Sequence, residues 1–184
     1  LLIAIPFAFT ARRGLVMFAS SAGLAGFGMI MIFILQMAVG NLYMLAAVIL
    51  TLLLAGLAAG AAMGERLALR KITVCSLLLT ALITLTGLLA PALVTSAPGP
   101  VLTYLFITLP AAGFITGAIY RIQTSRNAGR HTGRIYAADM AGSALGYMIA
   151  ASVLVPLAGI ANACFVLAAV ILISGTVASF VIKE

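Results

Sequence analysis

Six long apolar runs, each able to cross a lipid bilayer, constrain this sequence more than any other feature. A membrane-spanning helix needs about 20 largely apolar residues. The runs that meet this requirement cover residues 14–37, 41–63, 72–94, 101–120, 135–157 and 161–181. Residues 1–9 have the pattern of the end of a further helix, and because the chain opens with Leu1 we expect an upstream segment. We therefore predict an all-α, polytopic membrane helix bundle that forms one transmembrane domain over residues 1–184.

The composition supports a surface that faces lipid and leaves little for catalysis. Hydrophobic residues make up 65% of the chain and charged residues 7%, whereas a soluble domain is about 45–50% apolar and about 25% charged. The chain has three carboxylates, and its single histidine, His131, lies between two apolar runs. We therefore expect no enzyme activity, no metal site and no cofactor. Cys75 and Cys164 lie within apolar runs, which favours buried thiols over a disulfide.

Basic residues occupy every second gap between the apolar runs, and the intervening gaps carry no charge. By the positive-inside rule, the basic gaps and the C-terminus face the cytoplasm. The net charge of +7 then reports orientation and attraction to anionic lipid, and we expect no nucleic-acid binding. Docking of a partner domain on the 121–134 segment stays open as a second interpretation. The basic residues of the two central gaps are Arg66, Arg70, Lys71, Arg121, Arg126, Arg130 and Arg134.

Glycines repeat at four-residue intervals within three of the runs. This spacing lets helix backbones approach closely in lipid, where no hydrophobic force draws helices together. Tight packing within the bundle is the main interpretation, and a sliding surface for conformational change is the alternative. The glycines concerned are Gly56, Gly60, Gly64, Gly113, Gly117, Gly142 and Gly146.

Asp139 is the foremost candidate for an intramembrane polar site. It lies about one turn inside the run 135–157, where an ionised carboxylate is costly. Helical spacing places Tyr136, Ser143 and two of the spaced glycines on its side, so we expect this side to face the packed interior. A cation, proton or polyamine contact is one interpretation. A structural acid that complements the helix dipole and pairs with Arg66, Arg121 or Arg134 is the other.

Gln36 is the second polar candidate and lies at the outer end of the first run. Its amide can bind a solute or form a hydrogen bond to a neighbouring helix. The predicted topology places Gln36 and Asp139 on opposite sides of the membrane, so we do not expect them to form one site.

Two blocks of the sequence resemble one known family. The run GRIYAADMAGSALG (133–146), followed by LVPLAG (154–159), is similar to a helix motif of bacterial membrane proteins called fused spermidine synthases. The segments FILQ (33–36), GNLY (40–43) and LAGLAAGA (54–61) resemble a second motif of this family. The resemblance implies a bacterial inner-membrane protein whose bundle is similar to half of a major-facilitator fold. The family's soluble aminopropyltransferase domain has no counterpart in these 184 residues.

Together these features favour a non-catalytic integral membrane module that anchors or assembles with other membrane or membrane-associated subunits. A transporter or half-transporter for a cationic or small solute, such as a polyamine, is the alternative. It is weighed lower because transporters place polar groups near the bilayer midplane, where this sequence has few. A membrane domain that serves a separate aminopropyltransferase is the third possibility.

Overall fold

The computed structural model describes residues 12–40, 42–63, 72–125 and 132–181, and its secondary-structure elements in these ranges are all helices. The all-α prediction is thus confirmed for the described residues, whereas residues 1–9 lie outside them. The elements are α2 (Arg12–Val39), α3 (Leu42–Met63), α4 (Ile72–Thr95), α5 (Pro98–Ser125), α6 (Thr132–Ile149), the π-helix η1 (Ala150–Leu154) and α7 (Val155–Val181).

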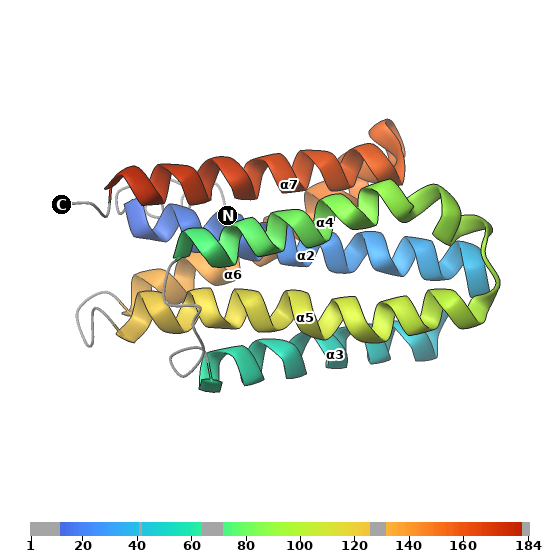
Figure 1. The fold of residues 1–184 in the computed structure, drawn as a ribbon, viewed down its shortest axis with the longest axis horizontal. Helices are drawn as coiled ribbons and strands as arrows, with labels where there is room; N and C mark the ends of the chain where they lie inside the picture. The colour runs from blue at the N-terminus through green and yellow to red at the C-terminus, as the bar shows by residue number, and fades with distance from the viewer. Residues whose placement is uncertain (1–11, 41, 64–71, 126–131, 182–184) are drawn as a thin grey trace.

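Among the described residues, five helical segments are long and apolar enough to cross a membrane. Four of them fall within α2, α3, α4 and α5. The fifth, Thr132–Val177, is 46 residues long and joins α6, η1 and α7. It contains Gly159, whose φ of 78° and ψ of 169° are not helical. Figure 1 shows α7 lying beside α4 along the bundle, after the chain has turned back from the far end of α6.

The outer surface of the bundle is largely apolar. A soluble monomer seldom exposes large contiguous apolar patches, but lipid-facing helices must do so. The exposed side chains on the three helices α4, α5 and α7 include Val74, Leu77, Leu85, Leu88, Phe106, Ile107, Val166, Val170 and Ile173. The distribution fits a multi-pass membrane protein.

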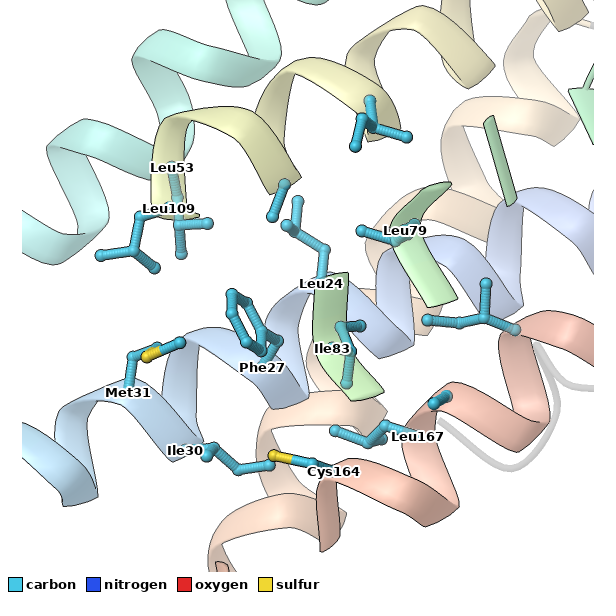
Figure 2. Close-up of a cluster of buried hydrophobic side chains, with 14 of the residues drawn as sticks. Leu24, Phe27, Ile30, Met31, Leu53, Leu79, Ile83, Leu109, Cys164 and Leu167 are labelled. Atoms are coloured by element: carbon cyan, nitrogen blue, oxygen red, sulfur yellow. The ribbon is translucent and has the colours of Figure 1, made fainter. Parts of the chain in front are cut away.

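Helix α2 forms the centre of the core. Its side chains Leu24, Phe27, Ile30 and Met31 are buried. Figure 2 shows them surrounded by labelled side chains from α3, α4, α5 and α7, which are Leu53, Leu79, Ile83, Leu109, Cys164 and Leu167. The two cysteines are both buried and are not joined in a disulfide. The core therefore contains side chains of α3, α4, α5 and α7 that pack around the central helix α2.

Three helix pairs carry the most extensive packing: α3 with α5, α2 with α6, and α4 with α7. Glycines bring the first pair together. A Cβ atom on Gly56 would lie 2.3 Å from the carbonyl oxygen of Pro110, and one on Gly60 would lie 2.0 Å from that of Phe114. From the other side, Cβ atoms on Gly113 and Gly117 would lie 2.3 Å and 2.1 Å from backbone oxygens of α3. In both sets of contacts, the residue further along α3 meets the residue further along α5, so the two helices run parallel.

The α2–α6 pair repeats this arrangement. Cβ atoms on Gly142 and Gly146 would each lie 2.3 Å from a carbonyl oxygen, that of Phe18 and that of Ala22 respectively. These two helices are therefore also parallel and in backbone contact. Six of the seven glycines singled out by their spacing lie at such contacts, and Gly64 lies outside the described residues.

The helix ends differ from the expected runs where proline and arginine occur. Helix α5 begins at Pro98 rather than at residue 101, because the first turn of a helix tolerates a residue without an N–H. It continues to Ser125 rather than stopping at 120, and α6 begins at Thr132 rather than at 135. Arg121 and Arg134 therefore lie on terminal helical turns, where their side chains are exposed. Arg66, Arg70, Lys71, Arg126 and Arg130 lie outside the described residues.

Candidate functional site: a groove between helices α3 and α6

A cavity of about 330 Å³ lies on one face of the bundle. Within the described ranges, no Cα atom of α3 lies within 8 Å of a Cα atom of α6, and both helices pack on α2. The cavity occupies the space between them, and we call it the α3–α6 groove. Its lining consists of Leu24 and Ala25 from α2; Leu50, Leu53, Leu54 and Leu57 from α3; and Asp139, Met140, Ser143 and Tyr147 from α6.

Asp139 is the charged member of this lining. Asp139 is only 9% exposed, so little of it is accessible to solvent or lipid. The hydroxyl Oγ of Ser21, a buried residue of α2, donates a hydrogen bond to Oδ1 of Asp139. The acid is therefore held against the central helix while it borders the groove.

The structure groups the polar residues differently from the helical-spacing prediction. Ser143 lines the groove together with Asp139. Tyr136 is 55% exposed and is not part of the lining. The expectation that Tyr136 turns to the packed interior is therefore wrong. The reason is that each residue turns by about 100° around a helix, so Tyr136 lies about 120° from Gly142, and Gly142 is the residue that packs on the backbone of α2.

Gln36 lies far from this group. It is exposed near the C-terminal end of α2, whereas Asp139 lies in the first half of the parallel helix α6. The two residues therefore belong to opposite halves of the bundle length, as the sequence predicts, and do not share a site. Of the three arginines considered as partners of Asp139, Arg134 is exposed at the start of α6 and Arg66 lies outside the described residues. Arg121 is exposed near the C-terminal end of α5. The hydrogen bond that the structure describes for Asp139 comes from Ser21.

Two contributors were missed by sequence reasoning. Tyr147 follows Asp139 by eight residues, which is close to two helical turns and places both on one face; this spacing was available as a signal. The Tyr147 hydroxyl lies close to α2, 3.5 Å from the position of a Cβ on Gly28. Ser21 gave no comparable signal, since its pairing with Asp139 joins residues 118 positions apart.

Other polar groups lie away from the groove. Thr86 of α4 and Tyr104 of α5 share a hydrogen bond of 2.7 Å between their hydroxyls. The side chains of Ser20 and Gln123 are buried and have no hydrogen-bond partner among the described residues. The described lining of the groove thus offers one carboxylate, two hydroxyl side chains and an apolar wall, a set that can bind a ligand.

Comparisons of the chain with known protein families, with curated proteins and with solved structures give no match. Function is therefore inferred from the groove and from the way the helices pair.

Proposed function

We propose that this chain is a non-catalytic, six-pass membrane module that assembles with a partner membrane protein through the face that contains the α3–α6 groove. The observation that carries the proposal is the position of Asp139. Ionisable residues within membrane segments almost always face the interior of a bundle or a water-filled cavity. Asp139 is held against the central helix by Ser21 and also borders a groove that opens on the outer face of the bundle, so a partner that covers the groove would complete its separation from lipid.

The count of six passes rests on the long C-terminal segment. A straight helix of 46 residues would measure about 69 Å, which is more than twice the hydrocarbon thickness of about 30 Å. The non-helical backbone of Gly159 provides a turn within it. We infer that Thr132–Val177 crosses the membrane twice. The ends of α2, α3, α5, α6 and α7 that adjoin the basic segments then share one side of the membrane, and these ends lie together in Figure 1.

The helix pairing supports a repeat of two three-helix units, α2–α4 and α5–α7. The second helix of each unit packs on the first helix of the other unit, through glycines spaced four residues apart in α3 and α6. The third helices, α4 and α7, pack on each other. The two units start at opposite ends of the bundle, so their topologies are inverted. Each six-helix half of a major-facilitator protein contains such a 3+3 inverted repeat, and in those proteins two halves assemble.

The edges of the groove are suited to a protein interface in the membrane. Leu54, on the α3 edge, is 64% exposed, and Leu50 and Met140 are exposed beside it. The floor belongs to α2, which is covered by α4, α5 and α7 on its other sides. A partner helix or helix pair on this face would complete the coverage of the central helix.

A transporter for a cationic solute is the second candidate, and Asp139 in a cavity is the observation that favours it. Uptake into proteoliposomes distinguishes it from assembly alone. Transport predicts uptake that is lost in Asp139→Asn while insertion and folding are retained. A pure assembly role predicts no uptake by either protein.

The assembly proposal is tested by the mass of the protein extracted from its native membrane in mild detergent and measured by native mass spectrometry. We expect a complex of fixed stoichiometry. Leu54→Trp should dissociate it because the larger side chain obstructs the groove face. The matched control is Leu88→Trp on α4, whose side chain is 65% exposed, and it should leave the complex intact. A monomer without companions, or equal masses for both variants, contradicts the proposal.

A further inference from the structure

The charge of the α3–α6 groove is unbalanced. Its described lining contains the Asp139 carboxylate and no Lys, Arg or His. Ser21 contributes a hydrogen bond to this carboxylate but no charge. A carboxylate removed from water is costly unless it is paired with a cation. When Asp139 is ionised, its counter-charge must come from outside the described lining of the groove.

The shape of the groove adds a second condition. Asp139 and Tyr147 are eight residues apart on α6, which corresponds to a length of about 12 Å. The wall across from them is formed by leucines of α3, and the floor by Leu24 and Ala25. The volume of about 330 Å³ lies at the lower end of the range of small-molecule sites, about 300–1,000 Å³. The acid is therefore at one end of a small, largely apolar space.

We propose that the groove binds a single ammonium group carried on an apolar chain. The ammonium pairs with the Asp139 carboxylate, and the chain lies along the leucine wall toward Tyr147. This inference concerns a ligand and goes beyond assembly; it holds whether a partner covers the groove or not.

The same geometry disfavours a polyamine, the solute considered from sequence. A polyamine carries several ammonium groups, and the groove lining offers one carboxylate. Any further ammonium group would lie against leucine side chains without a counter-ion, which is strongly unfavourable. The ligand class that fits is a lipophilic monoamine.

The test uses the whole chain in nanodiscs made of phosphatidylcholine alone, whose trimethylammonium headgroup has no N–H to donate to a carboxylate. Radiolabelled decylamine is the probe, and empty nanodiscs are used to subtract partitioning. Decanol, which has the same chain length but no charge, is the matched control ligand. We expect saturable decylamine binding that weakens at least about tenfold in Asp139→Asn, as for loss of one partner of a buried charge pair. Decanol binding should not respond to the substitution. Equal decylamine binding by both proteins would overturn the proposal.

A second pair of variants protects the test against misfolding of Asp139→Asn. Leu54→Trp narrows the groove from its exposed α3 edge, and Leu88→Trp places the same bulk on the lipid-facing surface of α4. We expect decylamine binding to be lost in the first variant and kept in the second. If both variants bind as the unmodified chain does, the ligand is not in the groove and the proposal fails. Because this assay contains no partner protein, it can fail or succeed independently of the assembly proposal.

The ammonium group can belong to a free amine or to a lipid headgroup, and a third arm separates these sources. Nanodiscs that contain phosphatidylethanolamine present the same ammonium on a lipid. If phosphatidylethanolamine competes with decylamine in the unmodified chain but not in Asp139→Asn, the result supports the lipid as occupant. If it does not compete, the result supports the free amine. Competition that is unchanged in Asp139→Asn would contradict an ammonium site at this carboxylate.

Discussion

Ser21 of the central helix α2 donates a hydrogen bond to Asp139 of α6, and this contact joins the floor of the α3–α6 groove to one of its walls. Ser21 lies one residue before Ala22, whose carbonyl oxygen is approached by Gly146. The polar contact and the glycine contacts therefore belong to one interface. Close backbone approach brings a short side chain such as serine within reach of the acid.

The Ser21–Asp139 pair should stabilise the bundle modestly. In a double-mutant cycle of Ser21→Ala and Asp139→Ala, we expect a coupling free energy of about 0.6 kcal/mol and at most about 1.7 kcal/mol, the average and the maximum found for hydrogen bonds between membrane helices. The measurement is unfolding of the purified protein in mixed detergent micelles. Ser152→Ala is the control partner for Asp139→Ala, because the Ser152 hydroxyl bonds to its own helix at Met148. Additivity in the Ser21 cycle would contradict the contact.

Enlarging a glycine at the α2–α6 contact should separate the two helices. In Gly142→Ala the new methyl group would lie 2.3 Å from the backbone oxygen of Phe18. A backbone atom cannot move aside as the end of a flexible side chain can. We expect a loss of about 1–3 kcal/mol in the free energy of unfolding, as for other overpacked sites. Gly133→Ala in the same helix has no atom within 4 Å, so its stability should be unchanged or higher. Equal effects of the two substitutions would refute the packing role of Gly142.

The turn at Gly159 should require glycine. Its φ of 78° with ψ of 169° belongs to a region that is essentially restricted to glycine, and forcing another residue into it costs about 1–3 kcal/mol. We expect Gly159→Ala to lower the thermal unfolding temperature. Gly99→Ala, at an open position with no positive φ, should not. A Gly159→Ala protein as stable as the Gly99→Ala protein would show that the turn tolerates a side chain.

Single cysteines should map the passes of the C-terminal segment. The native cysteines are buried, so their background labelling should be low. With a maleimide that does not cross membranes, we expect Gly99→Cys and Leu157→Cys to react in intact spheroplasts and Gly133→Cys to react only after permeabilisation. Leu157 is suitable because it is 82% exposed and close to the turn. Labelling of positions 133 and 157 from the same side would contradict two crossings by Thr132–Val177.

Hydropathy and charge alone predicted much of the helical layout. The gaps after residues 63 and 120 could be placed because they contain arginine, and charges cannot remain in the apolar interior of the membrane. The helix ends shifted where local chemistry allowed a further turn, as at Pro98 and Arg121. Such shifts depend on capping and on the position of the interface, which hydropathy does not resolve.

The candidate site was predictable only in part. The position of Asp139 within an apolar run identified it, and the glycine spacing placed its side of α6 against another helix. Which helix that is, and hence the role of Ser21, depends on tertiary packing between segments far apart in the sequence. Tyr136 illustrates the same limit, because one turn of helix separates it from Asp139 and yet it is exposed. The spacing of residues along a helix identifies one face of that helix, but not which other helix packs against that face.

The most direct test of the account is site-specific photocrosslinking in native membranes at two matched positions. Benzoylphenylalanine replaces either Leu54, on the edge of the α3–α6 groove, or Leu88, on the lipid-facing side of α4; the two side chains are equally exposed, at 64% and 65%. We expect a discrete protein adduct of one identified partner from position 54 and none from position 88, with the adduct lost in a Met140→Trp background that obstructs the facing edge. Absence of an adduct at 54, or the same adduct at both positions, would contradict a partner that covers the groove.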